Sequence, residues 1–262
     1  MLKLEILEEA FPLAQSFNIS RGSKTEAKVI HVIANQDGFS GHGECVPYAR
    51  YGETCETVRQ QIEALPDQFS RGELQSIIPA GAARNAVDCA LWDLEAKQTG
   101  QPVWQLAGLE EPKPLTTAYT LSLNEPDEML LEAQKNAHRP LLKIKLGTTQ
   151  DIPRLEAVRN GAPKSTIIVD ANEGWELDTF LSIQDDLKRL EIAMIEQPLP
   201  ENGDEELIDQ HFQIPLCADE SAHTSKGLEE LASKYAFVNI KLDKTGGLTH
   251  ALVMKQRAEE LG

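Results

Sequence analysis

The second half of the sequence alternates short apolar runs with helix-like stretches, and this alternation restricts its fold more than any other feature. Beyond Leu115, the apolar runs are residues 115–123, 141–147, 166–174, 192–200, 214–221 and 237–247, and the helical stretches are 126–137, 151–161, 177–190 and 226–235. Repeated strand–helix units of this kind predict an α/β fold with a parallel sheet or (β/α) barrel. A closed barrel needs eight units. We therefore predict a TIM-like barrel that is incomplete, with six of its eight units.

The first part of the chain differs and predicts a separate α+β domain. Its expected elements are strands at 2–11 and 27–36, a polar loop at 14–26, a glycine-rich turn at 37–44 and helices at 56–68 and 79–100. The last helix ends at Gly100, a common residue at a helix C-terminus. We predict an α+β domain at 1–112 and the barrel domain at 113–262, divided near the proline-bearing stretch 110–114.

Composition and charge exclude several classes of function. The net charge is −17 and the basic residues are scattered, which argues against a nucleic-acid surface. The N-terminus carries acidic residues where a signal peptide needs an apolar core, and no apolar run approaches the about 18 residues of a membrane span. The four cysteines are widely spaced and form no CxxC pair. We predict a reduced cytoplasmic protein that binds neither nucleic acid nor membrane.

Ionisable residues close five consecutive predicted strands. They are Lys143 and Lys145, then Asp170, Glu196, Asp219 and Lys241. Reactive groups of parallel α/β folds gather at the C-terminal ends of the strands. Alternation along 237–243 places Asn239, Lys241 and Asp243 on one face of the last strand. These residues together predict a functional site.

Asp170, Glu196 and Asp219 are the candidate metal ligands. Carboxylates on neighbouring strands suit a hard divalent cation, most naturally Mg²⁺. Zinc fits less well, because neither cysteine nor histidine occupies these strand ends.

Lys145 and Lys241 flank the acids and are the candidate proton-transfer groups, with Lys143 in an auxiliary electrostatic role. A lysine in water has a pKa of about 10.4 and is a poor base. We expect a neighbouring lysine, a bound cation and partial burial to lower that pKa. The cation would stabilise the charge that develops when a proton next to a carboxylate is removed.

Each motif also has a simpler interpretation. The lysines of 141–147 could protect an edge strand from aggregation, and the acids of 169–174 and 218–221 could be helix caps. Residues 195–200 could be a strand end turned by proline, and we interpret 244–247 as an ordinary turn. The coincidence of acids on successive strands, with lysines on both sides, favours the site.

With these residues in place, the chain resembles the enolase superfamily, in its muconate lactonizing enzyme-like branch, and most closely the dipeptide epimerases of the L-Ala-D/L-Glu type. The stretches that carry the resemblance are KIKLG, VDANEGW, IEQPLP, ADES and VNIKLDKTGGLT, with GAARNAVDCALWDLEAK similar to the helix of the capping domain. The superfamily pairs a Lys or His base with Mg²⁺. The resemblance implies an isomerase that moves a proton at the α-carbon of the C-terminal residue of a dipeptide. It also implies murein peptide metabolism and a homo-oligomer.

The resemblance implies a capping domain whose loops cover the site. Here these are residues 14–24, with Arg21 a candidate for binding a substrate carboxylate, and 44–53, with Tyr48 and Tyr51. The family holds the substrate amino group with an Asp-x-Asp motif after the eighth strand, whereas this sequence stops after the sixth. We expect a shortened protein whose open sheet exposes apolar edges.

Three other functions stay open. A lyase or cycloisomerase of the same superfamily, similar to o-succinylbenzoate synthase, would use one lysine as base and the other to stabilise charge. A Schiff-base aldolase would use a lysine alone and leave the carboxylates without a role. A non-catalytic alternative is an inactive metal-binding fragment.

Overall fold

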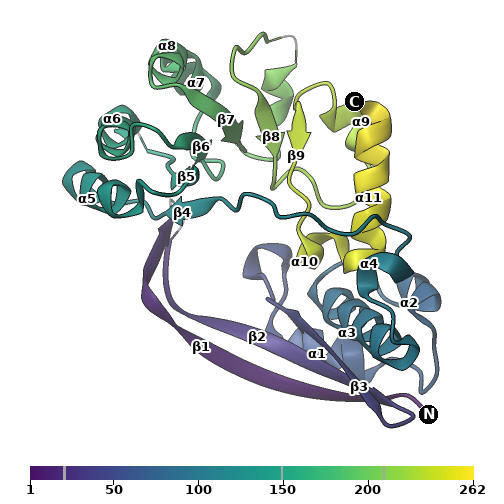
Figure 1. Cartoon of the computed structure of the whole chain (residues 1–262). Coiled ribbons are helices and arrows are strands. Elements are labelled where there is room, and N and C mark those ends of the chain that lie inside the picture. Colours follow the sequence, from purple (N-terminus) through teal and green to yellow (C-terminus); the bar gives the residue numbers. More distant parts are fainter. Residues whose placement is uncertain (20–21, 149, 209) are drawn as a thin grey trace.

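The structure is a computed structural model that describes residues 1–19, 22–148, 150–208 and 210–262, and it contains two sheets (Figure 1). The first part of the chain contains β1 (Lys3–Ile19), β2 (Gly22–Gln36), β3 (Phe39–Cys45), η1 (Ala49–Tyr51), α1 (Cys55–Glu63), α2 (Arg71–Ile77), α3 (Ala82–Thr99) and α4 (Val103–Leu106). The second part begins with β4 (Tyr119–Leu121), α5 (Pro126–Asn136), β5 (Leu141–Lys145), α6 (Asp151–Gly161), β6 (Thr166–Asp170), α7 (Leu177–Ser182), α8 (Gln184–Arg189) and β7 (Ile192–Glu196). It continues with η2 (Asp204–Leu207), β8 (Leu216–Ala218), α9 (Leu228–Leu231), β9 (Phe237–Val238), α10 (Leu242–Thr245) and α11 (Leu248–Leu261).

The first sheet is antiparallel, in the order β1-β2-β3. Its first two strands form a long hairpin, so most of the loop predicted at 14–26 is strand and that prediction is wrong. Backbone pairing continues past a register shift between Pro12 and Phe17, to Phe17 opposite Lys24. An antiparallel ribbon satisfies its backbone hydrogen bonds within the pair, so polar side chains do not prevent it from extending.

Helix α3 packs against this sheet at very short range. A side chain at Gly41 would meet the carbonyl oxygen of Ala90 at 2.2 Å, and one at Gly43 would meet that of Ala86 at 2.0 Å. Glycine on the strand and alanine on the helix therefore allow the two backbones to approach. The core of this domain lies in the same layer and includes Ile30, Val32, Ala34, Val58, Leu74 and Leu94. This packing makes the antiparallel sheet a rigid base for the segment that follows β3.

The second sheet is parallel, in the order β4-β5-β6-β7-β8-β9, which matches the predicted six strands of an incomplete (β/α) barrel. Within the described residues the two edge strands, β4 and β9, do not pair with each other. Leu142 and Ile144 of β5, and Leu146 directly after it, are fully buried, as the alternation predicts. Because all strands run the same way, their C-terminal ends lie along one rim of the sheet.

Several predicted elements are shorter than expected. The helix predicted at 177–190 is divided into α7 and α8 at Ile183, and the one at 226–235 is reduced to α9. Strand β9 ends at Val238, so Lys241 is not a strand residue but the N-cap of α10. The regular alternation predicted for 237–243 therefore fails at its end, because Asp243 lies in a helix.

Helices α10 and α11 join the two domains. The Arg84 guanidinium of α3 donates to the carbonyl oxygen of Thr245 at 2.7 Å and to that of Gly246 at 3.1 Å. The backbone N–H of Thr249 donates to Asp88 at 2.9 Å. The boundary predicted at 112/113 lies in the extended segment between α4 and β4. Among the described residues, no helix has the length and apolar character that crossing a membrane requires.

Candidate active site

The three predicted metal ligands meet at the C-terminal rim of the parallel sheet. Asp170 ends β6, Glu196 ends β7 and Asp219 directly follows β8. Each offers one oxygen within 4.8 Å of the others, and all three residues are buried. The register pairs Asp170 with Glu196 as neighbours, so the parallel sheet itself brings these carboxylates together.

The two lysines of β5 lie beside this cluster. The Lys143 Nζ is 2.5 Å from Glu196 Oε2 and 2.8 Å from Asp170 Oδ2. The Lys145 Nζ donates to Asp170 Oδ2 at 2.6 Å and to Asn172 Oδ1 at 2.9 Å. Both side chains therefore point to the site face of the strand, as the two-residue spacing predicts.

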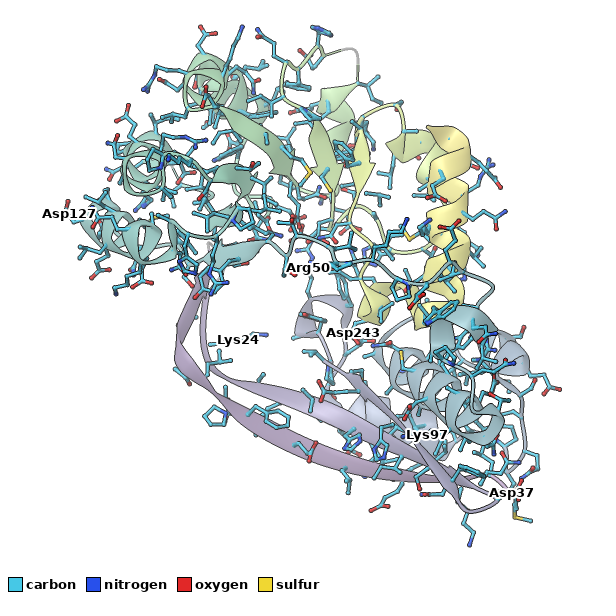
Figure 2. All side chains as sticks on the ribbon, viewed as in Figure 1. Lys24, Asp37, Arg50, Lys97, Asp127 and Asp243 are labelled. Carbon is cyan, nitrogen blue, oxygen red and sulfur yellow. The ribbon has the colours of Figure 1, made fainter. Side chains whose placement is uncertain are left out.

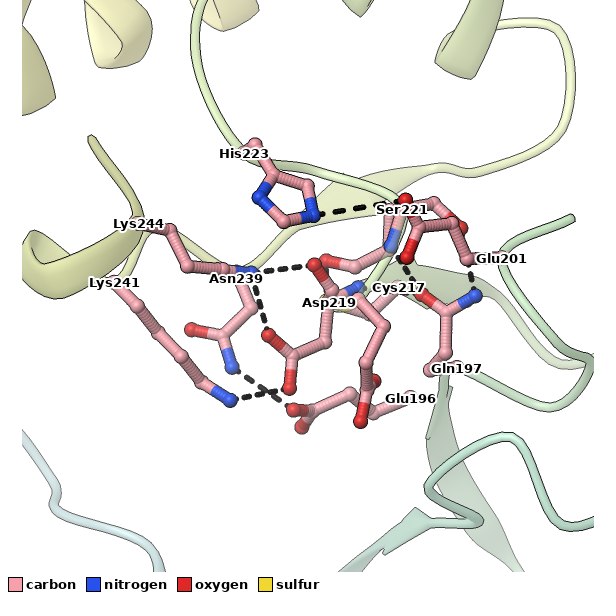
Figure 3. Close-up of polar contacts among 12 residues, drawn as sticks. Glu196, Gln197, Glu201, Cys217, Asp219, Ser221, His223, Asn239, Lys241 and Lys244 are labelled. Atoms are coloured by element: carbon pink, nitrogen blue, oxygen red, sulfur yellow. Dashed lines mark hydrogen bonds and ion pairs between the residues drawn. The ribbon is translucent and has the colours of Figure 1, made fainter. Parts of the chain in front are cut away.

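The opposite end of the cluster is built by residues that follow β9 (Figure 3). Lys241 donates to Asp219 Oδ2, and Lys244 donates to Asp219 Oδ1 at 2.6 Å. Asn239 donates its amide to Glu196 Oε1 at 2.9 Å. Lys145, on β5, and Lys241, which follows β9, thus approach the carboxylates from two sides, with three strands between β5 and β9 in the sheet.

The surroundings of the cluster lower the pKa of two of its carboxyls and raise the pKa of the third. Burial would raise the pKa of Asp170, but the charges of Lys143 and Lys145 outweigh it and hold the pKa below its usual value. Lys244 and Lys241 lower the pKa of Asp219 in the same way. Burial and the charge of Asp170 raise the pKa of Glu196. The lysines therefore favour the charged forms of Asp170 and Asp219, whereas the charged form of Glu196 is the least stabilised of the three.

The pKa values of Lys143 and Lys241 are raised among these carboxylates, whereas the lowered lysine pKa predicted from the sequence was for lysines next to a bound cation. Burial tends to lower the pKa of Lys143, but the charges of Asp170 and Glu196 outweigh it and raise the pKa. Asp219 raises the pKa of Lys241 against the same opposing effect of burial. The expectation counted a bound cation next to the lysines, whereas here the lysines themselves neutralise the acids.

The donor set fits a hard divalent cation such as Mg²⁺. Asp170, Glu196 and Asp219 supply only oxygen, from rigid strand ends, and are buried away from competing water. The same oxygens now hold ammonium groups at hydrogen-bond distance, which shows that the cluster accepts positive charge there.

The capping domain places part of its predicted substrate-binding set near the rim. The Tyr48 and Tyr51 rings are 6.1 Å apart, and Tyr51 packs edge-on against His223 with centroids 4.8 Å apart. Burial and the charge of Asp219 raise the pKa of Tyr51 to about 12, so its hydroxyl stays protonated near the site. The remaining predicted residue, Arg21, lies outside the described residues.

Lys24 also belongs to this side of the site. It extends from the hairpin into the space between the hairpin and the parallel sheet (Figure 2), and its Nζ lies 5.6 Å from the Tyr48 ring centroid.

Family models match both parts of the chain. Residues 1–108 match the mandelate racemase / muconate lactonizing enzyme N-terminal domain, and residues 128–262 match the enolase C-terminal domain-like family. The chain belongs to the enolase superfamily. The predicted domain boundary lies between the two matched regions of this superfamily architecture.

Relatives within the superfamily resemble the chain over most or all of its length. L-Ala-D/L-Glu epimerase of Escherichia coli is 44% identical over 268 residues, which cover 100% of this chain and 84% of that protein. N-acetyl-D-glutamate racemase of a Pseudoalteromonas species is 45% identical over 240 residues, covering 89% of this chain and 76% of the racemase. A crystal structure of an Agrobacterium tumefaciens enolase family member with homology to dipeptide epimerases, with bound sodium and L-Ala-L-Glu, has a TM-score of 0.97 at 50% identity. It covers 100% of this chain and 82% of that one.

The sequence analysis did not predict the role of Lys244, the most buried of the four lysines around the carboxylates. Its side chain is 1% exposed and binds both the carboxylate and the carbonyl oxygen of Asp219. We interpreted residues 244–247 as an ordinary turn. The short helix α10 turns it back into the site. Asn172 was also missed as a polar partner of Lys145, whereas Asn239, predicted on the same face as Lys241, donates to Glu196.

Proposed function

We propose that this chain is a Mg²⁺-dependent epimerase that inverts the α-carbon of the C-terminal residue of a dipeptide such as L-Ala-D/L-Glu. The observation that carries the proposal is the arrangement of three buried carboxylates with Lys145 on one side and Lys241 on the other. The 44% identity to an L-Ala-D/L-Glu epimerase over the whole chain supports the substrate class.

We assign the cation to Asp170, Glu196 and Asp219. When bound, Mg²⁺ supplies positive charge that stabilises the carboxylate next to the carbon losing its proton. Solved dipeptide epimerases support this choice, including one from Cytophaga hutchinsonii complexed with Mg and D-Ala-L-Val, which is 29% identical with a TM-score of 0.91 and covers 98% of this chain and 76% of that one.

The lysines perform the proton transfer in this proposal. Inversion requires removal of the α-proton on one face and delivery of a proton on the other, so two groups must face the same carbon from opposite sides. The positions of Lys145 and Lys241 support this role, because Lys145 lies on β5 and Lys241 follows β9, the strands on either side of the three that carry or precede the acids. Lys143, held between Asp170 and Glu196, contributes positive charge rather than a proton.

The substrate side of the proposal involves the capping domain. Tyr48 and Tyr51 border the rim and can pack against the substrate, and Arg21 is proposed to bind a side-chain carboxylate. We also propose a cytoplasmic homo-oligomer that acts in murein peptide metabolism on a small dipeptide, with no nucleic acid and no membrane as partner; the family resemblance and the acidic composition support these points.

A racemase of N-acylated glutamate is a second candidate. The 45% identity to N-acetyl-D-glutamate racemase favours it specifically, and the reaction needs the same opposed proton transfer. Both substrates contain a glutamate with a free α-carboxylate and an acylated nitrogen. The acyl group is an alanyl residue with a free amino group in the dipeptide and an acetyl group in N-acetylglutamate.

Proton NMR in D₂O tests the proposal directly. The enzyme with Mg²⁺ is given L-Ala-L-Glu, L-Ala-D-Glu or N-acetyl-D-glutamate, and the glutamyl α-proton is followed with an EDTA control. We expect metal-dependent loss of that signal with appearance of the other dipeptide diastereomer. Faster exchange of N-acetyl-D-glutamate would establish the second candidate instead. Exchange that survives EDTA, with trapping by borohydride, would point to Schiff-base chemistry and refute both.

A further inference from the structure

A short segment after β3 is one of the described parts of the capping domain that approach the site. Residues 48–51 follow β3 and include η1, and we refer to them as the 48–51 segment. Tyr51 contacts His223 in the loop after β8, while the Tyr48 backbone N–H donates to Glu53 at 3.1 Å. The segment therefore lies between its own domain and the rim of the parallel sheet. Its position decides where both tyrosines stand relative to the carboxylates.

Arg50 ties this segment to two loops of the barrel domain. Its Nη2 donates to Glu173 Oε1 at 2.7 Å and to Glu201 Oε2 at 3.2 Å. Glu173 follows β6 and Glu201 follows β7, so one guanidinium bridges two neighbouring strand ends. Figure 2 shows Arg50 between the capping domain and the ends of the parallel strands. A single cation thus joins three separate segments of the chain.

The Glu173 end of this bridge is firmly held. The Glu173 side chain is 9% exposed, and its Oε1 also accepts the backbone N–H of Glu201 at 2.8 Å. The Glu173 backbone N–H donates to the carbonyl of Gln197 at 2.9 Å. A partly buried ion pair with fixed partners is screened less than one between two free surface side chains.

The bridge is also connected to the proton-transfer end of the site. Asn172 and Glu173 have φ angles of +46° and +65°, a conformation that non-glycine residues adopt at a cost. The Asn172 side chain accepts from Lys145 at 2.9 Å. The loop that receives Arg50 is therefore the one that supports Lys145.

We propose that Arg50 is a positioning residue that holds the 48–51 segment closed over the site through Glu173 and Glu201, and so sets the affinity for substrate. The proposal rests on the epimerase function given above. Arg50 itself needs no contact with substrate in this role, because its charge is already met by two carboxylates. Holding the segment closed orders Tyr48 and Tyr51 before the substrate arrives, which reduces the entropy that is lost on binding.

Steady-state kinetics of matched variants test the proposal. In Arg50→Ala we expect KM to rise about tenfold, equivalent to ~1.4 kcal/mol, with kcat changed less than about twofold. Glu173→Gln should raise KM in the same direction, because it removes the charge that Arg50 binds. The double variant should be no worse than Arg50→Ala, since both changes break one contact. Arg50→Lys should recover part of the loss.

The chain contains a good control for a general effect of losing an arginine. Arg189 also bridges two carboxylates, Glu156 and Asp186, but these lie on the outer helices of the barrel domain. Arg189→Ala should leave KM unchanged.

A second readout does not depend on activity. Chymotrypsin cleaves after Tyr48 and Tyr51, and the native protein should be cut there faster in Arg50→Ala and Glu173→Gln than in the wild type or in Arg189→Ala.

The outcomes separate this proposal from the proposed function. If the wild type does not exchange the α-proton of any substrate, the function fails, and the proteolysis still decides whether Arg50 holds the segment. An unchanged KM in Arg50→Ala, in an active wild type, would overturn the positioning role. A raised KM in Arg50→Ala with an unaffected Glu173→Gln would also overturn it, and would mean that Arg50 contacts the substrate directly.

Discussion

The two ends of the proposed site are built in different ways. Lys145 stands on a regular strand, with its side chain 11% exposed and held by Asp170 and by Asn172 from the next strand end. Lys241 stands beyond the end of β9 at the start of α10, and its side chain is 44% exposed. One lysine is placed by the sheet, and the other by a helical turn that rests on the capping domain.

This difference shows which contacts each lysine depends on. The β5 end needs only the parallel sheet and the loop after β6. The β9 end needs α10, whose Asp243 accepts the backbone N–H of Val46 at 3.3 Å and the side chain of Asn85 at 2.6 Å. Both of these partners belong to the capping domain. A substitution that disturbs the contacts between the two domains should therefore displace Lys241 more than Lys145.

Replacing either lysine should have the largest effect and tests the comparison directly. In Lys145→Ala and in Lys241→Ala we expect epimerisation to fall by about 10²–10⁴-fold, the usual contribution of a positioned acid or base. Each variant should still exchange the α-proton of one dipeptide diastereomer, and the two variants should keep opposite ones. NMR in D₂O with each diastereomer separately measures this. Retention of the same diastereomer by both variants would contradict an opposed pair.

Removing Lys244 should destabilise the β9 end. Lys244→Met leaves the buried Asp219 without its most deeply placed cation, and loss of one partner from a buried pair costs about 3 kcal/mol in the free energy of unfolding. Urea denaturation of the metal-free protein measures the change. Lys255→Met is the control, because its exposed pair with Glu259 on α11 should contribute about 0.5 kcal/mol or less. Equal stability of the two variants would show that Lys244 is not a structural cation.

Asp243 should have a smaller effect, which appears as a dependence of the free energy of unfolding on pH. Burial raises its pKa from 3.8 to about 6, with the charges of Glu53 and Glu44 adding to the effect. A carboxyl that binds its proton more tightly when folded contributes stability below its unfolded pKa and loses it as pH rises through the folded value. Wild type should therefore lose up to about 2 kcal/mol relative to Asp243→Asn between about pH 4 and 7.

Urea titrations of both proteins across that range provide the measurement. A difference that stays constant, or grows in favour of the wild type as pH rises, would rule out this effect of Asp243.

The regular parts of the fold and site could be predicted from the sequence. Lys143, Lys145, Asp170 and Glu196 lie on or at the ends of real strands, where a two-residue period decides the direction of each side chain. The end of the hairpin predicted as a loop, the break at Ile183 and the early end of β9 could not be predicted. Each depends on what a backbone segment pairs with, which local composition does not reveal.

By itself, the sequence determined the parallel α/β architecture, the carboxylates at the strand ends and the two lysines of β5 beside them, because these follow from periodicities of the strands. Tertiary structure alone decided the rest. It turned Lys244 into the site and moved Asp243 out of it, because a helical turn replaced the expected strand. It also brought Arg50 to Glu173 and Glu201, since a contact across 123 residues of chain exists only once two domains have packed.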